Sequence, residues 1–267
     1  MTFSNTINEK DGKVLAVIPA RLQSTRLPEK PLANILGKPM IQWVYEKTCK
    51  ASLIHRTVVA TDSEKIKKAV ESFGGEAIMT SPDHQSGTDR LVEVAKAFKE
   101  YDTIINVQGD EPMIDPHTLD YLISKFSESE CTTLGTLAKA PQLTDEILSP
   151  NSAKVVVSKK NKALYFSRSP IPFSRDQKLT KKSSVSEIKN CNYLIHIGIY
   201  IYKREFLLKF PHLESSVLEQ TEKLEQLRVL ENDYPIVVFQ TKSSSIGVDT
   251  MEDLEQVREL MTKENYC

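Results

Sequence analysis

The chain of 267 residues has a mass of 30.2 kDa, with 40% hydrophobic and 27% charged residues, a composition that excludes a disordered or fibrous protein. Its 35 Lys and Arg residues balance 36 Asp and Glu residues to a net charge of -1, so no overall positive field attracts nucleic acid, and an anion must be bound locally. No signal peptide and no run of the roughly 20 apolar residues that span a bilayer occur, so we expect no membrane association.

Short apolar strands alternate with amphipathic helices through the first half of the chain. The run VLAVI at residues 14–18 predicts a strand that is buried on both faces. Parallel strands need crossover connections, so this alternation predicts a mostly parallel, doubly wound α/β sheet of Rossmann-like architecture. After the first strand, the predicted elements are a helix at 40–49, a strand at 56–60, a helix at 66–73, a strand at 76–79, a helix at 91–98, a strand at 103–107 and a helix at 119–126.

The second half is less regular, and its apolar segments indicate additional, partly antiparallel sheet. Strands are predicted at 131–137, 154–158, 163–166 and 193–202, a polar excursion at 174–190, a leucine-striped helix at 218–230, a strand at 236–240 and a helix at 251–261. With no internal repeat and no Gly/Ser-rich linker, we expect a polar extension over 1–12 and one domain over 13–267, with an embedded subregion at about 131–215. The four widely spaced cysteines form no CxxC pair and suit a reducing cytoplasm.

A loop rich in cations follows the first predicted strand. Ligands of an open parallel sheet bind outside the carboxyl ends of its strands, which makes this loop a candidate site. It holds Arg21, Arg26 and Lys30, with Glu29 as its only acid. These cations suit the oxygens of a polyphosphate, although a solvated loop could have the same composition. Neither GxGxxG nor a Walker A pattern occurs in the loop, which disfavours both of those nucleotide-binding motifs.

Acidic residues follow two further predicted strands. Asp110 and Glu111 come directly after an apolar strand, and Asp249 lies in the last loop. Carboxylate oxygens at strand ends suit Mg²⁺, which takes one or two protein ligands and completes its shell with phosphate and water. The alternatives are a turn that caps the next helix and, for the last loop, a capping box formed by Thr250 and Asp253. With the cationic loop, the two acids predict an anion and metal site for a nucleotide or a sugar phosphate.

Seven blocks of sequence occur in an order known from one enzyme family: ARLQSTRLPEKPL, MTSPDHQSGTDR, NVQGDEPMI, ALYFSRSPIPF, HIGIYIY, LEQLRVLE and GVDT. They extend from about residue 14 to residue 255. In these blocks the chain resembles the 3-deoxy-manno-octulosonate (Kdo) cytidylyltransferases. The resemblance implies an enzyme that uses CTP, Kdo and Mg²⁺ to form CMP-Kdo and diphosphate for bacterial lipopolysaccharide, and that works as a homodimer assembled through the second half of the chain.

The resemblance also implies roles for individual residues. It makes Arg21, Lys30 and Asp110 catalytic and makes Asp110 and Asp249 the metal ligands. The implied nucleotide-binding residues are Ala20, Arg21, Ser24, Lys30, Thr80, Asp83, Ser86, Gly87, Arg90 and Gln108. The implied sugar-binding residues are Arg168, His196, Tyr200, Glu225 and Gln226.

From the residues alone, plainer interpretations stay open. A lone arginine is usually a surface residue, a histidine in an apolar strand is usually part of the core, and a Glu-Gln pair on a helix is usually its polar face. At the level of function, three alternatives remain: transfer to another acidic sugar, such as the 8-amino analogue of Kdo or a sialic acid; nucleotide binding without turnover; and, least favoured by the charge balance, nucleic-acid binding.

Overall fold

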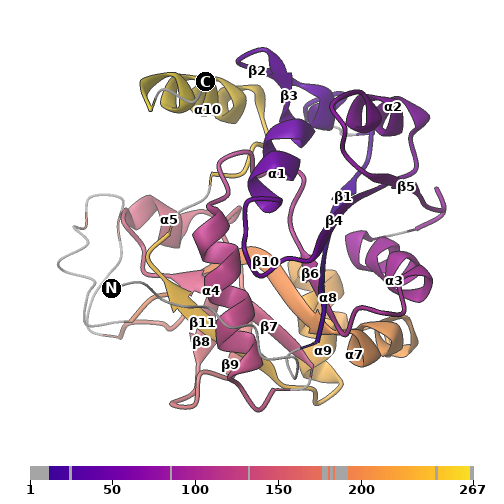
Figure 1. Ribbon diagram of the computed structural model, residues 1–267. Helices are drawn as coiled ribbons and strands as arrows, with labels where there is room; N and C mark the ends of the chain where they lie inside the picture. The colour runs from indigo at the N-terminus through magenta and orange to yellow at the C-terminus, as the bar shows by residue number, and fades with distance from the viewer. Residues whose placement is uncertain are drawn as a thin grey trace, which may run out of the picture.

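A mixed β-sheet forms the centre of the molecule (Figure 1). The computed structural model describes residues 12–23, 26–84, 86–131, 133–175, 180, 183, 192–243 and 246–264. Across the described part of the chain, the main path of the sheet runs β11 (Ile236–Thr241), β7 (Leu134–Lys139), β10 (Ile195–Lys203), β6 (Thr103–Asn106), β1 (Val14–Ala20), β4 (Arg56–Thr61), β5 (Ala77–Met79). Two further strands, β8 (Lys154–Val157) and β9 (Ala163–Ser167), form an antiparallel ladder that joins β10 beside Lys154.

The pairing confirms a mostly parallel sheet with an antiparallel part in the second half. Strand β1 is parallel to both of its neighbours, β4 and β6, and β7 is parallel to β11. Strand β10 enters between β6 and β7 and is antiparallel to both. Its register places Tyr200 opposite Asn106, so these two side chains lie on the same face of the sheet.

Helices cover both faces of the sheet. Alternate side chains of β1 enter different cores, because a strand points successive residues to opposite sides: Leu15 and Val17 pack into one core, Ala16 and Ile18 into the other. The first core is closed by α3 (Gly87–Ala97), α7 (Arg204–Lys209) and α9 (Gln226–Glu231), the second by α1 (Met40–Thr48), α2 (Glu64–Ser72) and α4 (Pro116–Ser127). The chain therefore forms the three layers expected of a doubly wound fold.

Several short elements lie outside the predictions. They are η1 (Lys30–Leu32), β2 (Asn34–Ile35), β3 (Lys38–Pro39), α5 (Thr144–Leu148), α7 and η3 (Phe210–His212), all too short to carry a full periodic pattern. The single helix predicted over 218–230 is wrong. It is two helices, α8 (Val217–Glu222) and α9, because Lys223 adopts a left-handed conformation with φ 55° and ends α8.

The other long elements begin and end within a few residues of their predicted bounds. The capping box predicted at Thr250 is confirmed at the start of α10 (Met251–Lys263). Residues 1–11 of the predicted extension, most of the excursion over 174–190, Cys191 and Cys267 lie outside the described residues. The proposed division into one domain with an embedded subregion stays a prediction.

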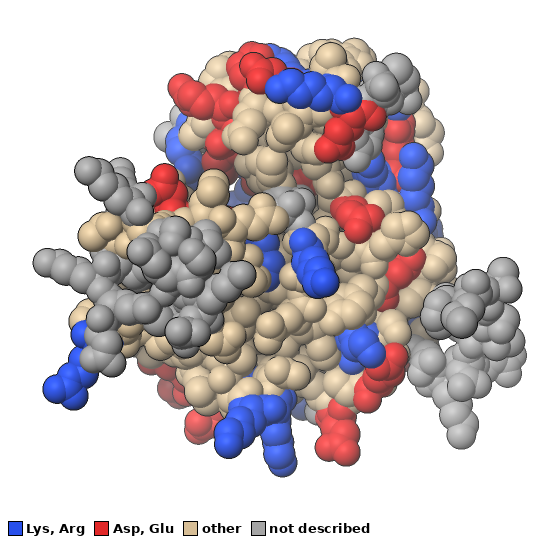
Figure 2. Space-filling model, turned by 90° about the vertical axis from the view of Figure 1, so that its left-hand side faces the viewer, with Lys and Arg blue, Asp and Glu red and all other residues tan. Residues whose placement is uncertain are grey.

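The surface of the described residues carries both signs of charge. Figure 2 shows Lys, Arg, Asp and Glu interspersed on the face that it draws, without a continuous basic stripe. In the described part of the chain, no helix has the length and hydrophobicity needed to cross a membrane.

Candidate active site

Three predicted residues from distant parts of the chain meet at Lys30. The Lys30 ammonium lies 2.6 Å from Asp110 Oδ2 and 3.1 Å from Asp249 Oδ1, and Arg26 lies 3.1 Å from the other oxygen of Asp249. Because both carboxylates contact the same nitrogen, they are close enough for one divalent ion to bind both. Burial alone would lower the pKa of Lys30, but its attraction to the two carboxylates raises this pKa above its ordinary value.

Close backbone packing brings Asp110 to this position. The loop that carries it leaves β6 and passes directly against the end of β1. A side chain at Gly109 would place its Cβ 2.8 Å from the carbonyl oxygen of Pro19, so only glycine permits this approach. The carbonyl of Asp110 then accepts a hydrogen bond from Val248 N at 2.8 Å, which ties the loop to the segment that carries Asp249.

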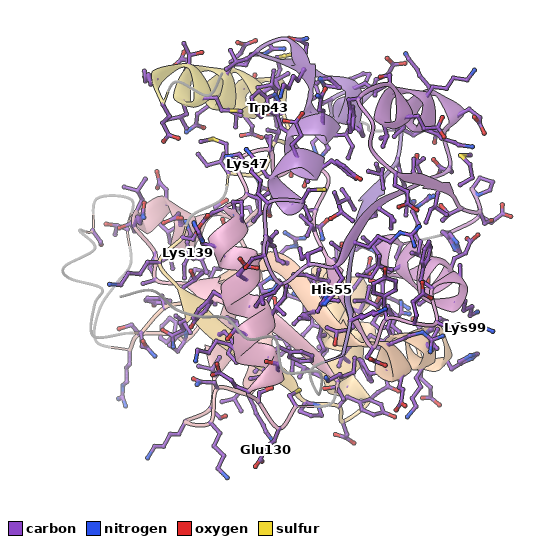
Figure 3. The ribbon with its side chains drawn as sticks, viewed as in Figure 1. Trp43, Lys47, His55, Lys99, Glu130 and Lys139 are labelled. Carbon is purple, nitrogen blue, oxygen red and sulfur yellow. The ribbon has the colours of Figure 1, made fainter. Side chains whose placement is uncertain are left out.

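Asp249 is positioned by α10 rather than by the sheet. The Asp249 N–H donates to Asp253 Oδ2 at 3.0 Å within the cap of that helix. Helix α10 buries Leu254 and Val257 in a separate small core together with Trp43 of α1. Figure 3 labels Trp43 beside α10 at the top of the molecule.

A cavity of about 310 Å³ opens over this cluster. Its wall holds three cations, Arg21, Arg26 and Lys30, together with the two aspartates. The lining residues are Pro19, Ala20, Arg21, Gln23, Arg26, Lys30, Pro31, Gln108, Gly109, Asp110 and Asp249. Among the described residues there is no group of three or more His, Cys, Asp or Glu side chains placed to hold a metal. An ion here would therefore have two protein carboxylates, which fits Mg²⁺ bound together with substrate phosphates.

The start of α3 faces the same loop. Arg21 donates to the carbonyls of His84 and Ser86, at 2.6 Å and 3.0 Å, and so joins the first loop to the turn before α3. Ser86 caps the helix by accepting from Asp89 N. Gly87 is the first residue of α3, so the free N–H groups of a helix N-terminus lie beside the cationic loop, an arrangement that favours anions.

The remaining nucleotide candidates differ in accessibility. Arg90 is fully buried and is bound to Asp62 at 2.7 Å and to Thr80, so it supports this region from within and lies outside the lining of the cavity described above. Asp83 lies in the turn that precedes α3, where its N–H donates to Ser81 Oγ at 3.1 Å. Ser24 lies outside the described residues.

A second cavity, of about 530 Å³, lies over β6 and β10. Its lining includes all five sugar candidates, Arg168, His196, Tyr200, Glu225 and Gln226. Gln108 lines both cavities and donates to the carbonyl of Gly198 at 3.0 Å. The two cavities are therefore adjacent, and a ligand in one can reach a ligand in the other.

Burial shifts the pKa values of three titratable groups that line the second cavity, His196, Tyr200 and Glu225. Burial lowers the pKa of His196 to about 3, and its Nε2 lies 3.0 Å from Thr136 Oγ1. Burial also raises the pKa of Tyr200 well above its ordinary value, so that its phenol stays protonated. Burial raises the pKa of Glu225 too, although Thr88 donates to this carboxyl at 2.6 Å and opposes the shift. The neutral ring of His196 and the protonated phenol of Tyr200 suit sugar hydroxyls.

Arg168 has a different environment from the one expected. Its Nε donates to the carbonyl of Glu222 at 2.7 Å, and its two terminal nitrogens donate to the carbonyls of Pro150 and Lys223 at 2.9 Å and 3.2 Å. Three of its five N–H groups thus join α8 to the loop before β8, and only the other two are left for a ligand. The role of Arg168 in sugar binding stays a prediction.

Three polar residues of this region were given no individual role by the sequence patterns. Arg26 was noted only as part of a cationic loop, and its pairing with Asp249 has no sequence signal. Thr88 is buried beside Glu225. It has no sequence signal either, because threonine is common in the first turn of a helix. Asn106 did have a signal, because an amide interrupts the apolar strand TIINV.

Comparisons with known proteins show the family to which the chain belongs. The sequence profile of the family described as cytidylyltransferase matches residues 15–244. The 3-deoxy-manno-octulosonate cytidylyltransferase of Geotalea uraniireducens is 50% identical over 251 residues, which are 94% of this chain and 100% of that protein. The enzyme of the same name from Fusobacterium nucleatum is 47% identical, over 95% of this chain and 98% of its own length.

Solved structures extend the comparison to three dimensions. A structure described as CMP:2-keto-3-deoxy-manno-octonic acid synthetase complexed with CTP is 45% identical and aligns over 94% of this chain and 99% of its own, with a TM-score of 0.85. The 4-diphosphocytidyl-2C-methyl-D-erythritol synthase of Anaerococcus prevotii is only 13% identical. It aligns over 95% of this chain and 97% of its own with a TM-score of 0.62, which shows a shared fold. The profile match and the identity over almost the full length mean that this chain belongs to the 3-deoxy-manno-octulosonate cytidylyltransferase family.

Proposed function

We propose that this protein transfers the cytidylyl group of CTP to the anomeric hydroxyl of Kdo. The oxygen of that hydroxyl gives up its proton to solvent and attacks the α-phosphorus. The bond from the α-phosphorus to the oxygen that bridges to the β-phosphorus breaks, so CMP-Kdo forms and diphosphate leaves. The activated sugar would supply lipopolysaccharide synthesis. The observation that carries the proposal is the meeting of Lys30, Asp110 and Asp249 beside a polar cavity large enough for a sugar.

The cluster around Lys30 fits a divalent cation and a triphosphate together. Asp110 and Asp249 would hold Mg²⁺, which, when bound, would neutralise phosphate charge. The Lys30 ammonium is carried on four methylene groups with rotatable bonds, so it can turn from the carboxylates to phosphate oxygens. Arg21 and Arg26 line the same cavity and add positive charge near the leaving diphosphate.

The second cavity would orient the sugar by hydrogen bonds. The protonated phenol of Tyr200 and the neutral ring of His196 can each exchange hydrogen bonds with hydroxyls. Gln108 lines both cavities, so we expect it near the point where the nucleophile meets the α-phosphate. Holding two anions in one geometry is itself a large part of such catalysis.

Diphosphate release from the purified enzyme tests this proposal. CTP with Kdo should give CMP-Kdo, identified by mass, at a rate well above that with UTP, the 8-amino analogue of Kdo or a sialic acid. Faster turnover with another sugar acid would overturn the choice of Kdo. CTP binding without diphosphate release, measured by calorimetry, would favour a binding protein instead of an enzyme.

We also infer a cytoplasmic homodimer. CTP is a cytoplasmic nucleotide, and the free thiols of Cys49 and Cys131 suit a reducing compartment. Light scattering should give twice the mass of the 30.2 kDa chain, and a monomer mass at assay concentrations would contradict the dimer.

A further inference from the structure

Asn106 is a buried amide that faces the second cavity. It is the last residue of β6, its exposed fraction is 4%, and it belongs to the lining of the 530 Å³ cavity. Within the part of the chain that the structure describes, its Oδ1 is buried and accepts no hydrogen bond. The neighbours across the sheet are Val17 on β1 and Tyr200 on β10.

An unpaired buried acceptor needs a physical explanation. Most buried side-chain polar atoms in proteins have a hydrogen-bond partner, because desolvating an acceptor without replacing its bond to water is unfavourable. An apolar side chain at this position would not carry that cost. The amide at Asn106 therefore costs the free protein stability, and a bound ligand that supplies a donor would remove that cost.

The surroundings of Asn106 indicate what kind of ligand this is. Asn106 shares a face of the sheet with Tyr200, whose ring lies 5.4 Å from that of His196. Gln226 lines the same cavity at 4% exposure, and its Nε2 is likewise buried without an acceptor among the described residues. The cavity thus offers an unused acceptor and an unused donor, both uncharged. A hydroxyl group is donor and acceptor at once, so a polyol satisfies both.

We propose that Asn106 binds a hydroxyl group of the sugar substrate and is a specificity-determining residue of the enzyme. Its Oδ1 accepts the hydrogen bond of that hydroxyl. This inference rests on the proposed sugar transfer and adds a residue that acts on the sugar and not on the nucleotide. A site built to bond a hydroxyl discriminates strongly against an analogue that lacks it, because the buried acceptor is then left unpaired.

The test is Asn106→Leu, which keeps the number and the branching of the side-chain heavy atoms and removes the acceptor. We expect the KM for Kdo to rise about tenfold, which corresponds to the loss of one neutral hydrogen bond, while the KM for CTP stays unchanged. The melting temperature should stay the same or rise, because an unpaired polar group has been replaced by an apolar one. Thr103→Val is the matched control: Thr103 lies buried in the same strand, outside the cavity lining, and its variant should leave both KM values unchanged.

A purely structural amide would give the opposite pattern, a lower melting temperature with an unchanged KM for Kdo, and that result would overturn the inference. If Asn106→Leu does not fold, Asn106→Ala takes its place in the same assays. A series of deoxy analogues of Kdo then identifies the hydroxyl. The analogue that lacks this hydroxyl should bind more weakly than Kdo to the wild type, and Asn106→Leu should not weaken its binding further. If the loss from the variant and the loss from the missing hydroxyl add up for every analogue, a direct bond is refuted. Absence of turnover with Kdo in the wild type would instead refute the proposed function.

Discussion

Replacement of Lys30 by methionine separates the catalytic role of its charge from its structural role. The ammonium contacts two carboxylates, and at an effective dielectric constant of about 20 two unit charges about 4 Å apart interact by about 4 kcal/mol. Water screens much of this interaction, because the Asp110 and Asp249 side chains are 31% and 47% exposed. Arg26 also continues to pair with Asp249. The free energy of unfolding should therefore fall by no more than about 2 kcal/mol.

Turnover should respond far more strongly than stability. Removal of one group that stabilises charge in a transition state typically lowers turnover by about 10² to 10³. We expect Lys30→Met to reduce diphosphate release by at least about 10², with little change in melting temperature. Lys38→Met is a suitable control, because it removes a comparable ion pair, with Glu46, outside both cavities.

A second measurement on Lys30→Met does not depend on activity. In the free protein the Lys30 ammonium contacts the same carboxylate oxygens that would bind a divalent ion. Without nucleotide, Mn²⁺ should bind Lys30→Met about tenfold more tightly than wild type, since no ammonium competes for these oxygens. Unchanged Mn²⁺ affinity together with near wild-type turnover would refute this account of the cluster.

Three further predictions follow from the same structure. Asp110→Asn and Asp249→Asn should each reduce diphosphate release by at least about 10², and near wild-type release by either purified variant would remove the metal assignment. Burial lowers the pKa of His196 to about 3, below its value near 6.5 in the unfolded chain, so the folded state binds fewer protons. Its contribution to stability is thus lost as the pH falls from about 6.5 towards 3, by up to about 1.4 kcal/mol per pH unit, and His196→Gln should flatten that part of a chemical-denaturation profile. Asp62→Ala leaves the fully buried Arg90 without its carboxylate and should reduce the free energy of unfolding by about 3 to 5 kcal/mol; a loss below about 1 kcal/mol would contradict the importance of this pair.

The spacing of apolar residues and the composition of the chain were sufficient to predict a mostly parallel sheet. The strands and long helices are regular enough for their apolar pattern to be decisive, and the rule that ligands bind at the carboxyl ends of parallel strands identified the loop after β1 and the loop after β6. The break at Lys223 was not predictable in this way. A lysine in the left-handed conformation is uncommon, and the leucines continue on both sides of it, so only the packing of α8 and α9 reveals two helices.

Side chains four residues apart in a regular strand share a face, and His196 and Tyr200 do so although β10 is irregular between them. The chain advances three residues from Ile197 to Tyr200 while its partner β7 advances one, from Leu137 to Thr136. Two residues are therefore extra. An even number of extra residues preserves the alternation of side chains, so both rings remain on one face with their centroids 5.4 Å apart. A bulge of one residue would have separated them.

The position of Asp249 depends on structure that no local pattern contains. It lies 219 residues from Lys30 in sequence, and the strands of the sheet do not bring them together. Helix α10 does so by burying Leu254 and Val257 against Trp43, while Val248 bonds to the backbone of Asp110. The two aspartates are thus held by different parts of the fold, one by the sheet edge and one by a peripheral helix. A small movement of α10 would change the distance between the two carboxylates without disturbing the central core. The geometry of the candidate metal site therefore depends on the small core that holds Leu254, Val257 and Trp43.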